Sequence, residues 1–435
     1  MNDPPSARQS AERPRTPLSR AFHRFWAGSL AANLADGVML TALPMVAAML
    51  TNDPLLVSGL MVARFLPWLL FGLVAGVIVD RVDRGRLMVA ANLVRGGALL
   101  VFAGLVATEN AAVWALYAVM FTVMLCEVFY DLAGRAILPA LVPTEDLDRA
   151  NGRLVGGKTV TEDFAGAPLA GLLFVVAAFL PLAVNAGAYL LGAFVLLGLP
   201  SAVRRPGGAP GEGDRDDAAR SVFVDMGEGL RFVFGDRSFR ATVVFNVVTN
   251  MAFVSQAGVL VLLVQEHFGV PEALYGVFLA SSAVGALIGA GLASRLVARA
   301  GRFPVVMAAF TTMGLCCAGF GLAPHAYVAA LAWLLLGAAM AVSNITVLGA
   351  VQVIVPATHL GRVMSCVQVL GFGMAPLGAF AGGLIGRVEL FYVPLTSGAL
   401  ILLGLILAAP SLRRVLARAG ERETANSGDD ARGDL

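Results

Sequence analysis

Several charged residues fall inside long apolar stretches of the chain, and three of them form the first candidate group for proton coupling. Asp36 lies about midway along the first stretch, Arg95 in the third and Glu127 in the fourth. A charge within a bilayer costs about 2.5–3.5 kcal/mol on insertion scales, so each residue needs a reason to be there. One hypothesis is proton coupling, in which Asp36 or Glu127 faces a partly dry cavity and loads and releases a proton. The other is a buried ion pair with Arg95, which lies at a depth similar to that of Glu127.

Asp36 is the main candidate for the proton carrier, because no basic residue lies one helical turn away on its own helix. In this hypothesis Glu127 and Arg95 form a switchable pair nearby.

A second charged group lies in the first third of the fifth apolar stretch. Glu162 follows Lys158 by four residues, and so the two share one face of a helix. This spacing favours a local ion pair, although Glu162 is also a candidate for proton coupling. Arg64, in the second stretch, could attract an anionic substrate or hydrogen-bond to exposed carbonyl groups.

Uncharged polar residues within the apolar stretches could line a substrate cavity or join helices by hydrogen bonds. These residues are Asn33, Asn246, Asn250, Gln256 and Asn344.

The apolar stretches identify the elements that must position these residues. Of 435 residues, 58% are hydrophobic and 14% are charged, whereas soluble domains have about 45–50% apolar and about 25% charged residues. A helix of about 20 apolar residues crosses the hydrocarbon core, and continuous apolar runs exclude the alternating strands of a β-barrel. Twelve spans are predicted, near residues 25–50, 56–79, 87–108, 111–133, 154–179, 182–202, 241–264, 272–297, 303–323, 326–350, 360–386 and 389–409.

The distribution of basic residues predicts the topology. The loops and termini of one side carry 27 of the 31 Lys and Arg residues, whereas the opposite side carries only Arg387. Basic loops stay in the cytoplasm, so both termini are expected there, in a bacterial inner membrane. The predicted segments are a disordered tail (1–20), a six-helix bundle (21–202), a linker (203–240), a second bundle (241–410) and a charged, disordered tail (411–435).

The two halves of the chain repeat at an offset of 213 residues. Asn33 corresponds to Asn246, and VPTEDLDR (142–149) corresponds to VPATHLGR (355–362) without a gap. Parallel repeats with a substrate site between them, near the membrane midplane, are typical of one transporter architecture. We therefore predict an all-α membrane protein with two pseudo-symmetric bundles of six helices.

Three segments resemble the major facilitator superfamily. GVIVDRVDRGR (76–86) resembles its loop signature after the second helix, and GAPLAG (166–171) resembles the antiporter motif of its fifth helix. FYDLAGRAILPALVPTEDLDRAN (129–151) resembles a segment of its drug and metabolite exporters, which include enterobactin exporters and macrolide efflux proteins. The resemblance covers about residues 22–410 and implies the major facilitator fold and export of a drug or metabolite.

The resemblance also implies a conformational latch at the cytoplasmic side. Asp80 would face the start of the eleventh helix near Gly361, where a carboxylate is favourable at a helix N-terminus. Together with Arg81, Arg84 and Asp131, it would hold the outward-facing state. The alternative is that the basic residues of this loop only anchor it in the cytoplasm.

No motif in the sequence indicates an enzyme, and we expect no cofactor, no metal and no nucleic-acid partner. The four Cys lack metal-site spacing, and GALIGAG (285–291) does not follow a strand, as a nucleotide loop would. The expected partners are a small-molecule substrate, protons and membrane lipid, and the chain is expected to be a monomer.

The expected function is secondary export of a hydrophobic or amphipathic compound, such as a drug or a macrolide-like or siderophore-like metabolite. Proton antiport and alternating access would drive it. The alternatives are an importer or uniporter on the same fold, and a non-transporting membrane sensor or scaffold.

Overall fold

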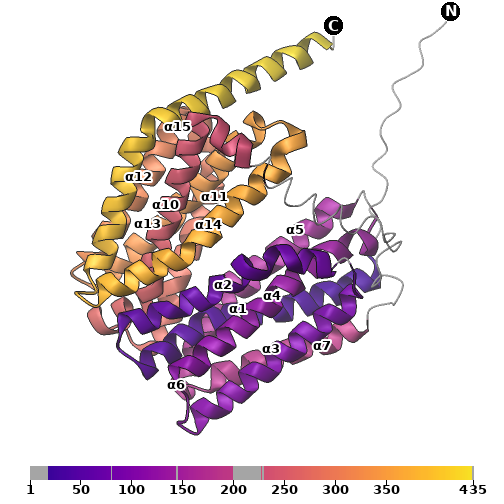
Figure 1. Cartoon of the computed structure of the whole chain (residues 1–435), viewed down its shortest axis with the longest axis vertical. Coiled ribbons are helices and arrows are strands. Elements are labelled where there is room, and N and C mark those ends of the chain that lie inside the picture. The colour runs from indigo at the N-terminus through magenta and orange to yellow at the C-terminus, as the bar shows by residue number, and fades with distance from the viewer. Residues whose placement is uncertain (1–17, 80, 144–145, 199–226, 228–229, 434–435) are drawn as a thin grey trace, which may run out of the picture.

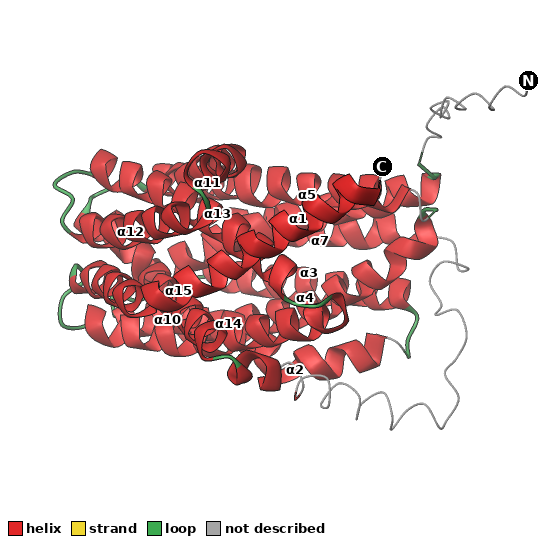
Figure 2. Cartoon of the chain, turned by 90° about the horizontal axis from the view of Figure 1, so that it is seen from above, coloured by secondary structure: helices red, strands yellow, loops and turns green. Residues whose placement is uncertain are grey.

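The computed structural model describes residues 18–79, 81–143, 146–198, 227 and 230–433, and these contain helices but no strands (Figure 2). The helices of the first half are α1 (Arg20–Leu50), α2 (Pro54–Val79), α3 (Arg84–Ala107), α4 (Val113–Leu141), α5 (Leu147–Lys158), η2 (Thr159–Gly166), α6 (Ala167–Val176) and α7 (Leu180–Leu197). Those of the second half are α10 (Arg237–Leu262), η3 (Leu263–His267), α11 (Glu272–Ala300), α12 (Arg302–Gly321), α13 (Ala326–Ile354), α14 (Ala357–Gly386) and α15 (Tyr392–Gly433).

Twelve helical segments in the described part of the chain are long and apolar enough to cross a membrane, as the sequence predicts. The fifth span joins α5, the π-helix η2 and α6, and the seventh joins α10 and the π-helix η3. The protein is therefore a multi-pass membrane protein.

Acidic and hydroxyl side chains fix the starts of several helices. The side chain of Ser19 accepts a hydrogen bond from the backbone N–H of Phe22 at the start of α1. Asp83 caps α3 in the same way, and Asp236 caps α10. Such caps satisfy N–H groups that have no partner within the helix.

The spans gather in two bundles that lie side by side (Figure 1). In the first bundle α3 packs on α4 and α7, α1 packs on α7, and α2 packs on α4. In the second bundle α12 packs on α13 and α15, α10 packs on α15, and α11 packs on α13. The same packing partners thus recur in the two halves.

The bundles meet at the end of the molecule that carries the loops 51–53 and 387–391, here called the loop end. There α2 packs on α14 and α6 packs on α11. The contacts are close because glycine lies at them: a Cβ on Gly383 would lie 2.1 Å from Ser58 Oγ, and one on Gly276 would lie 1.9 Å from the carbonyl oxygen of Ala167. At the opposite end, which carries the start of α1, a Cβ on Gly361 of α14 would meet open space.

The last helix is longer than the sequence predicts, because α15 continues to Gly433 where a disordered tail is expected from residue 411. Leu412, Val415, Leu416 and Ala419 are buried, and their spacing forms an apolar stripe along one helix face. Arg422 also donates a hydrogen bond of 2.5 Å to the carbonyl of Ile354. Because this segment contains many charged residues, the sequence alone did not reveal the apolar stripe, and the segment was expected to be disordered. The tail 1–17 and most of the linker lie outside the described residues.

Candidate functional site

A buried ion network lies at the centre of the first bundle. The guanidinium of Arg95, on α3, contacts the carboxylate of Glu127 on α4, and its Nη1 lies 3.9 Å from Asp36 Oδ1 on α1. The hydroxyl of Tyr189, on α7, donates a hydrogen bond to Asp36. Arg95 is 0% exposed and Asp36 is 4% exposed. Four helices therefore converge on one set of charges that is withdrawn from solvent.

Aromatic rings enclose the cation of this network. The guanidinium carbon of Arg95 lies 5.1 Å from the centre of the Tyr130 ring and 5.2 Å from that of Tyr189. A cation at this distance is attracted to the negative face of a ring. The rings stabilise Arg95 and exclude water from it at the same time.

At ion-pair distance the network has one cation, Arg95, for two carboxyl groups, and the positive charges of Arg64 and Lys158 act on them only from farther away. If both Asp36 and Glu127 were ionised, it would hold an uncompensated negative charge, which is costly to bury. One bound proton removes that excess. The structure thus contains the buried ion pair of one sequence hypothesis, and this pair does not exclude the other hypothesis, in which one of the carboxyl groups binds a proton.

The second charged group forms a local pair, as its spacing suggests. Lys158 Nζ lies 3.3 Å from Glu162 Oε2. The guanidinium of Arg64 lies 5.4 Å from the Phe65 ring and 4.0 Å from Met61 Sδ. Arg64 is not among the residues that line the cavity described next.

A cavity of about 770 Å³ lies mainly within the second bundle. Its walls come from α10, α11, α12 and α13, with Thr159, Phe164 and Ala167 of the first bundle closing one side. Three of the five predicted polar residues, Asn246, Asn250 and Asn344, line the cavity, but Asn33 and Gln256 do not. This volume falls in the range of small-molecule sites.

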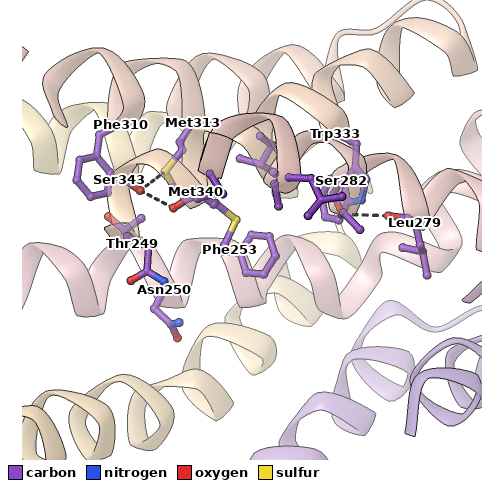
Figure 3. Close-up of a pocket in the computed structure, with 18 of the residues that line it drawn as sticks. Thr249, Asn250, Phe253, Leu279, Ser282, Phe310, Met313, Trp333, Met340 and Ser343 are labelled. Carbon is purple, nitrogen blue, oxygen red and sulfur yellow. Dashed lines mark hydrogen bonds between the residues drawn. The ribbon is translucent and has the colours of Figure 1, made fainter. Parts of the chain in front are cut away.

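Aromatic and sulfur-containing side chains form the apolar wall of this cavity (Figure 3). The rings of Phe253 and Trp333 stack with centroids 6.0 Å apart and planes 16° apart. Met313 and Met340 lie along the same wall, and Ser343 hydrogen-bonds to the Met340 carbonyl at 3.0 Å. The sequence reasoning missed these residues, because aromatic and Met side chains in an apolar span are usually core.

The repeat offset of 213 residues could have found part of this wall. It carries Asp36 to Thr249, Glu127 to Met340 and Tyr130 to Ser343, and all three second-half residues line the cavity.

Helix packing adds a fourth pair of positions. A Cβ on Gly96 would meet the side chain of Leu190, and a Cβ on Gly314 would meet that of Leu402. These two contacts join corresponding helices, so Arg95, which precedes Gly96, corresponds to Met313, which precedes Gly314. Met313 also lines the cavity.

The predicted latch is only partly within the described residues, since Asp80 is not among them. Arg84 donates a hydrogen bond of 3.1 Å to the carbonyl of Ala136 on α4, and Asp131 lies on the same helix. Arg81 lies in the turn after α2. Gly361 is exposed, with open space beside it. The latch stays a prediction.

An ion pair that the sequence did not predict joins the two bundles at the loop end. Arg387 Nε donates to Asp53 Oδ1 at 2.8 Å, and Arg387 Nη2 donates to Asp53 Oδ2 at 2.5 Å. The Arg387 guanidinium holds the pKa of the Asp53 carboxyl below its ordinary value. Asp53 also accepts a hydrogen bond from the N–H of Leu55, so the pair is fixed to the start of α2.

Known proteins resemble this chain over most of its length. A family model described as "Transmembrane secretion effector" matches residues 13–428. Macrolide efflux protein A of Streptococcus pyogenes is 23% identical over 385 residues, covering 88% of this chain and 93% of the relative.

Solved structures share the fold. A bacterial homologue of iron transporter ferroportin in the inward-facing state gives a TM-score of 0.73 at 18% identity, covering 92% of this chain and 99% of that chain. A structure of such a homologue in the outward-facing state with soaked iron gives a TM-score of 0.55 at 20% identity, covering 91% and 99%. These likenesses confirm the fold that the sequence motifs predict.

Proposed function

Because the chain belongs to the transmembrane secretion effector family of the major facilitator superfamily, we propose that this transporter exports a hydrophobic or amphipathic small molecule by proton antiport. The family description and the efflux protein among its relatives support export over import. The cavity supports a small-molecule substrate of amphipathic chemistry, because its wall combines aromatic rings with amide and hydroxyl groups.

The buried network of the first bundle carries the proposal of proton coupling. Asp36 and Glu127 share the single charge of Arg95, so the network changes its net charge when one proton binds. A site whose charge depends on which side of the membrane it faces is what an antiporter needs. Asp36 is the proposed carrier, and Glu127 is proposed to hold Arg95 in place.

Alternating access is proposed as the transport cycle. The bundles touch at the loop end, while Gly361 at the other end faces open space. If the termini are cytoplasmic, as the basic loops indicate, this arrangement corresponds to an inward-facing state. The greater likeness to the inward-facing ferroportin homologue supports that assignment.

Closure of the cytoplasmic end, in the outward-facing state, is proposed to use the loop after α2. Asp80 would then reach the start of α14 near Gly361 when the cytoplasmic ends approach.

Proton flux in proteoliposomes tests the proposed function. The purified protein is reconstituted with a pH-sensitive dye inside, and candidate amphipathic compounds are added to one side. Substrate-dependent proton movement opposite to the substrate is expected, and an imposed pH gradient should drive uphill accumulation of the compound. Uptake that stops at equal concentrations on both sides, whatever the pH gradient, would exclude proton antiport and leave a uniporter.

A further inference from the structure

We propose that the cavity in the second bundle selects uncharged compounds that combine a flat apolar face with both accepting and donating hydrogen-bond groups. The proposal rests on the transport function proposed above and names the substrate class that this function would serve.

The cavity offers no charged group to a ligand. None of the described residues that line it is Asp, Glu, Lys, Arg or His. Lys158, which precedes the lining residue Thr159, is paired with Glu162, and Arg95 is paired within the first bundle with Asp36 and Glu127. An ionic ligand would lose its hydration without gaining a counter-ion, and this loss is large for a full charge.

The neutral lining is a property of these side chains and not of the fold. The positions of Asp36, Arg95 and Glu127 correspond to Thr249, Met313 and Met340. The same helix positions therefore accommodate full charges in the first bundle and neutral side chains in the second.

The apolar wall fits a flat ring system. Phe253 and Trp333 stack, and Trp333 also meets Phe320 edge to face at 5.8 Å. Phe310 lines the cavity too, and its ring meets Phe245 at 4.7 Å. Rings that are held by other rings keep a fixed surface, against which another flat group packs well.

Polar groups without a partner set the hydrogen-bonding pattern of the ligand. Within the described part of the chain, the Nε1–H of Trp333, the Oγ1 of Thr249 and the Oδ1 of Asn250 are buried and lack hydrogen-bond partners. Trp333 is 4% exposed and Thr249 is 5% exposed. A buried donor or acceptor without a partner is destabilising, so a ligand that accepts from Trp333 and donates to Asn250 gains affinity.

Three naphthalene sulfonamide probes that share one ring system test this selection. Dansylamide is neutral at pH 7, dansylglycine is anionic, and the dansyl derivative of ethylenediamine is cationic. The protein has four tryptophans, and a variant with Trp26→Phe, Trp68→Phe and Trp114→Phe keeps only Trp333. Energy transfer from Trp333 to each probe, measured in nanodiscs without any gradient, gives the three affinities.

A second single-tryptophan variant corrects for probe dissolved in lipid. It keeps Trp114, which is 73% exposed and outside the cavity, and carries Trp333→Phe with the other two changes. Transfer from Trp114 should rise linearly with probe concentration, whereas transfer from Trp333 should saturate.

Two matched leucine variants on α10, made in the variant that keeps only Trp333, test whether the probe binds in the cavity. Dansylamide should bind at least about tenfold more tightly than either charged probe, a difference of about 1.4 kcal/mol. Asn250→Leu should weaken it several-fold, whereas Gln256→Leu, a buried amide outside the cavity lining, should not.

The result can overturn the proposal in three ways. A charged probe that binds as tightly as dansylamide removes the selection for neutral compounds. If Asn250→Leu and Gln256→Leu weaken dansylamide binding equally, Asn250 has no specific hydrogen-bonding role. If energy transfer from Trp333 rises linearly with concentration for all three probes, the cavity does not bind the flat ring system. Because no gradient is present, selective binding without proton flux in liposomes would instead reject the proposed antiport and leave the site standing.

Discussion

The two bundles use the same four helix positions in opposite ways. In the first bundle these positions hold charged and aromatic side chains that fill the space between the helices. In the second bundle they hold small or sulfur-containing side chains that line a cavity. The pairs are Asp36 and Thr249, Arg95 and Met313, Glu127 and Met340, and Tyr130 and Ser343.

The difference shows which part of a repeat is constrained. The contacts between helices recur, with Gly96 on Leu190 in one half and Gly314 on Leu402 in the other. Close helix packing tolerates few changes at such contacts. The side chains that point between the helices are less constrained, so one half can hold a charged network and the other can form a cavity.

Asp36→Asn should have the largest effect on transport, because the amide permanently mimics the protonated carboxyl group. Uphill export driven by a pH gradient should be abolished, while exchange down a substrate gradient survives. Proteoliposome uptake with and without a pH gradient measures both. Thr249→Val, at the corresponding position, should weaken substrate binding and leave the proton-to-substrate ratio unchanged. Full uphill transport by Asp36→Asn would transfer the role to Glu127 or Glu162.

Arg95→Met, which copies the residue of the second bundle, should cause the largest loss of stability. Removing one partner of a buried pair leaves uncompensated charge and costs about 3–5 kcal/mol. Thermal unfolding in detergent measures the loss. Adding Asp36→Asn and Glu127→Gln should restore much of it, because no charge is then left without a partner.

A surface arginine serves as the control for that experiment. Arg86, with its side chain 78% exposed, should change stability by less than about 1 kcal/mol on mutation to Met. A comparable loss of stability in Arg95→Met and Arg86→Met would mean that burial of the ion network does not determine the cost of losing an arginine.

Glu127→Gln should have a smaller effect than Asp36→Asn. The amide still accepts a hydrogen bond from Arg95, and Arg95 keeps Asp36 as its ionic partner. Uphill export should fall by no more than about tenfold, equivalent to about 1.4 kcal/mol. The same liposome assay measures it, and complete loss would make Glu127 the carrier.

Asp53→Asn should produce the smallest change, a modest shift away from the state in which the loop end is closed. The Arg387 guanidinium lowers the pKa of Asp53 in the closed state. The pair therefore stabilises closure fully above the ordinary carboxyl value of about 3.9, and this contribution is lost as the pH falls through the lowered pKa. Closure should be constant between about pH 5 and 8 and should weaken only below about pH 4.

Spin labels on α2 and α14 at the loop end measure this closure as a distance distribution. Asp83→Asn is the matched control, because Asp83 also caps a helix and pairs with an arginine, but within one bundle. A shift of similar size in both variants would show that the bridge between the bundles contributes nothing.

The sequence predicted the elements better than their contacts. Twelve spans follow from apolar runs, because each span must satisfy its own backbone in lipid. The nearness of Arg95 to Glu127 was also inferred, since both lie at a similar depth. The bond from Tyr189 to Asp36 was not, because which helices touch depends on the packing of the whole bundle.

The cavity was the largest gap in the sequence reasoning. Phe253, Trp333 and Met313 are apolar residues in apolar spans, and their composition does not separate a cavity wall from a core. Polar residues were a better guide, but only Asn246, Asn250 and Asn344 of the five predicted residues line the cavity. The ion pair of Asp53 with Arg387 was missed because its partners are 334 residues apart.

The π-helix η2 forms a thin partition between the two specialised regions. Thr159 and Phe164 line the cavity on one side. On the other, a Cβ on Gly37, the neighbour of Asp36, would lie 2.3 Å from the carbonyl oxygen of Glu162. A π-helix holds about one residue more per turn than an α-helix, and returning η2 to α geometry would rotate its two ends relative to each other by roughly 100°. Such a rotation would turn different side chains toward the cavity and toward Asp36 in the same step.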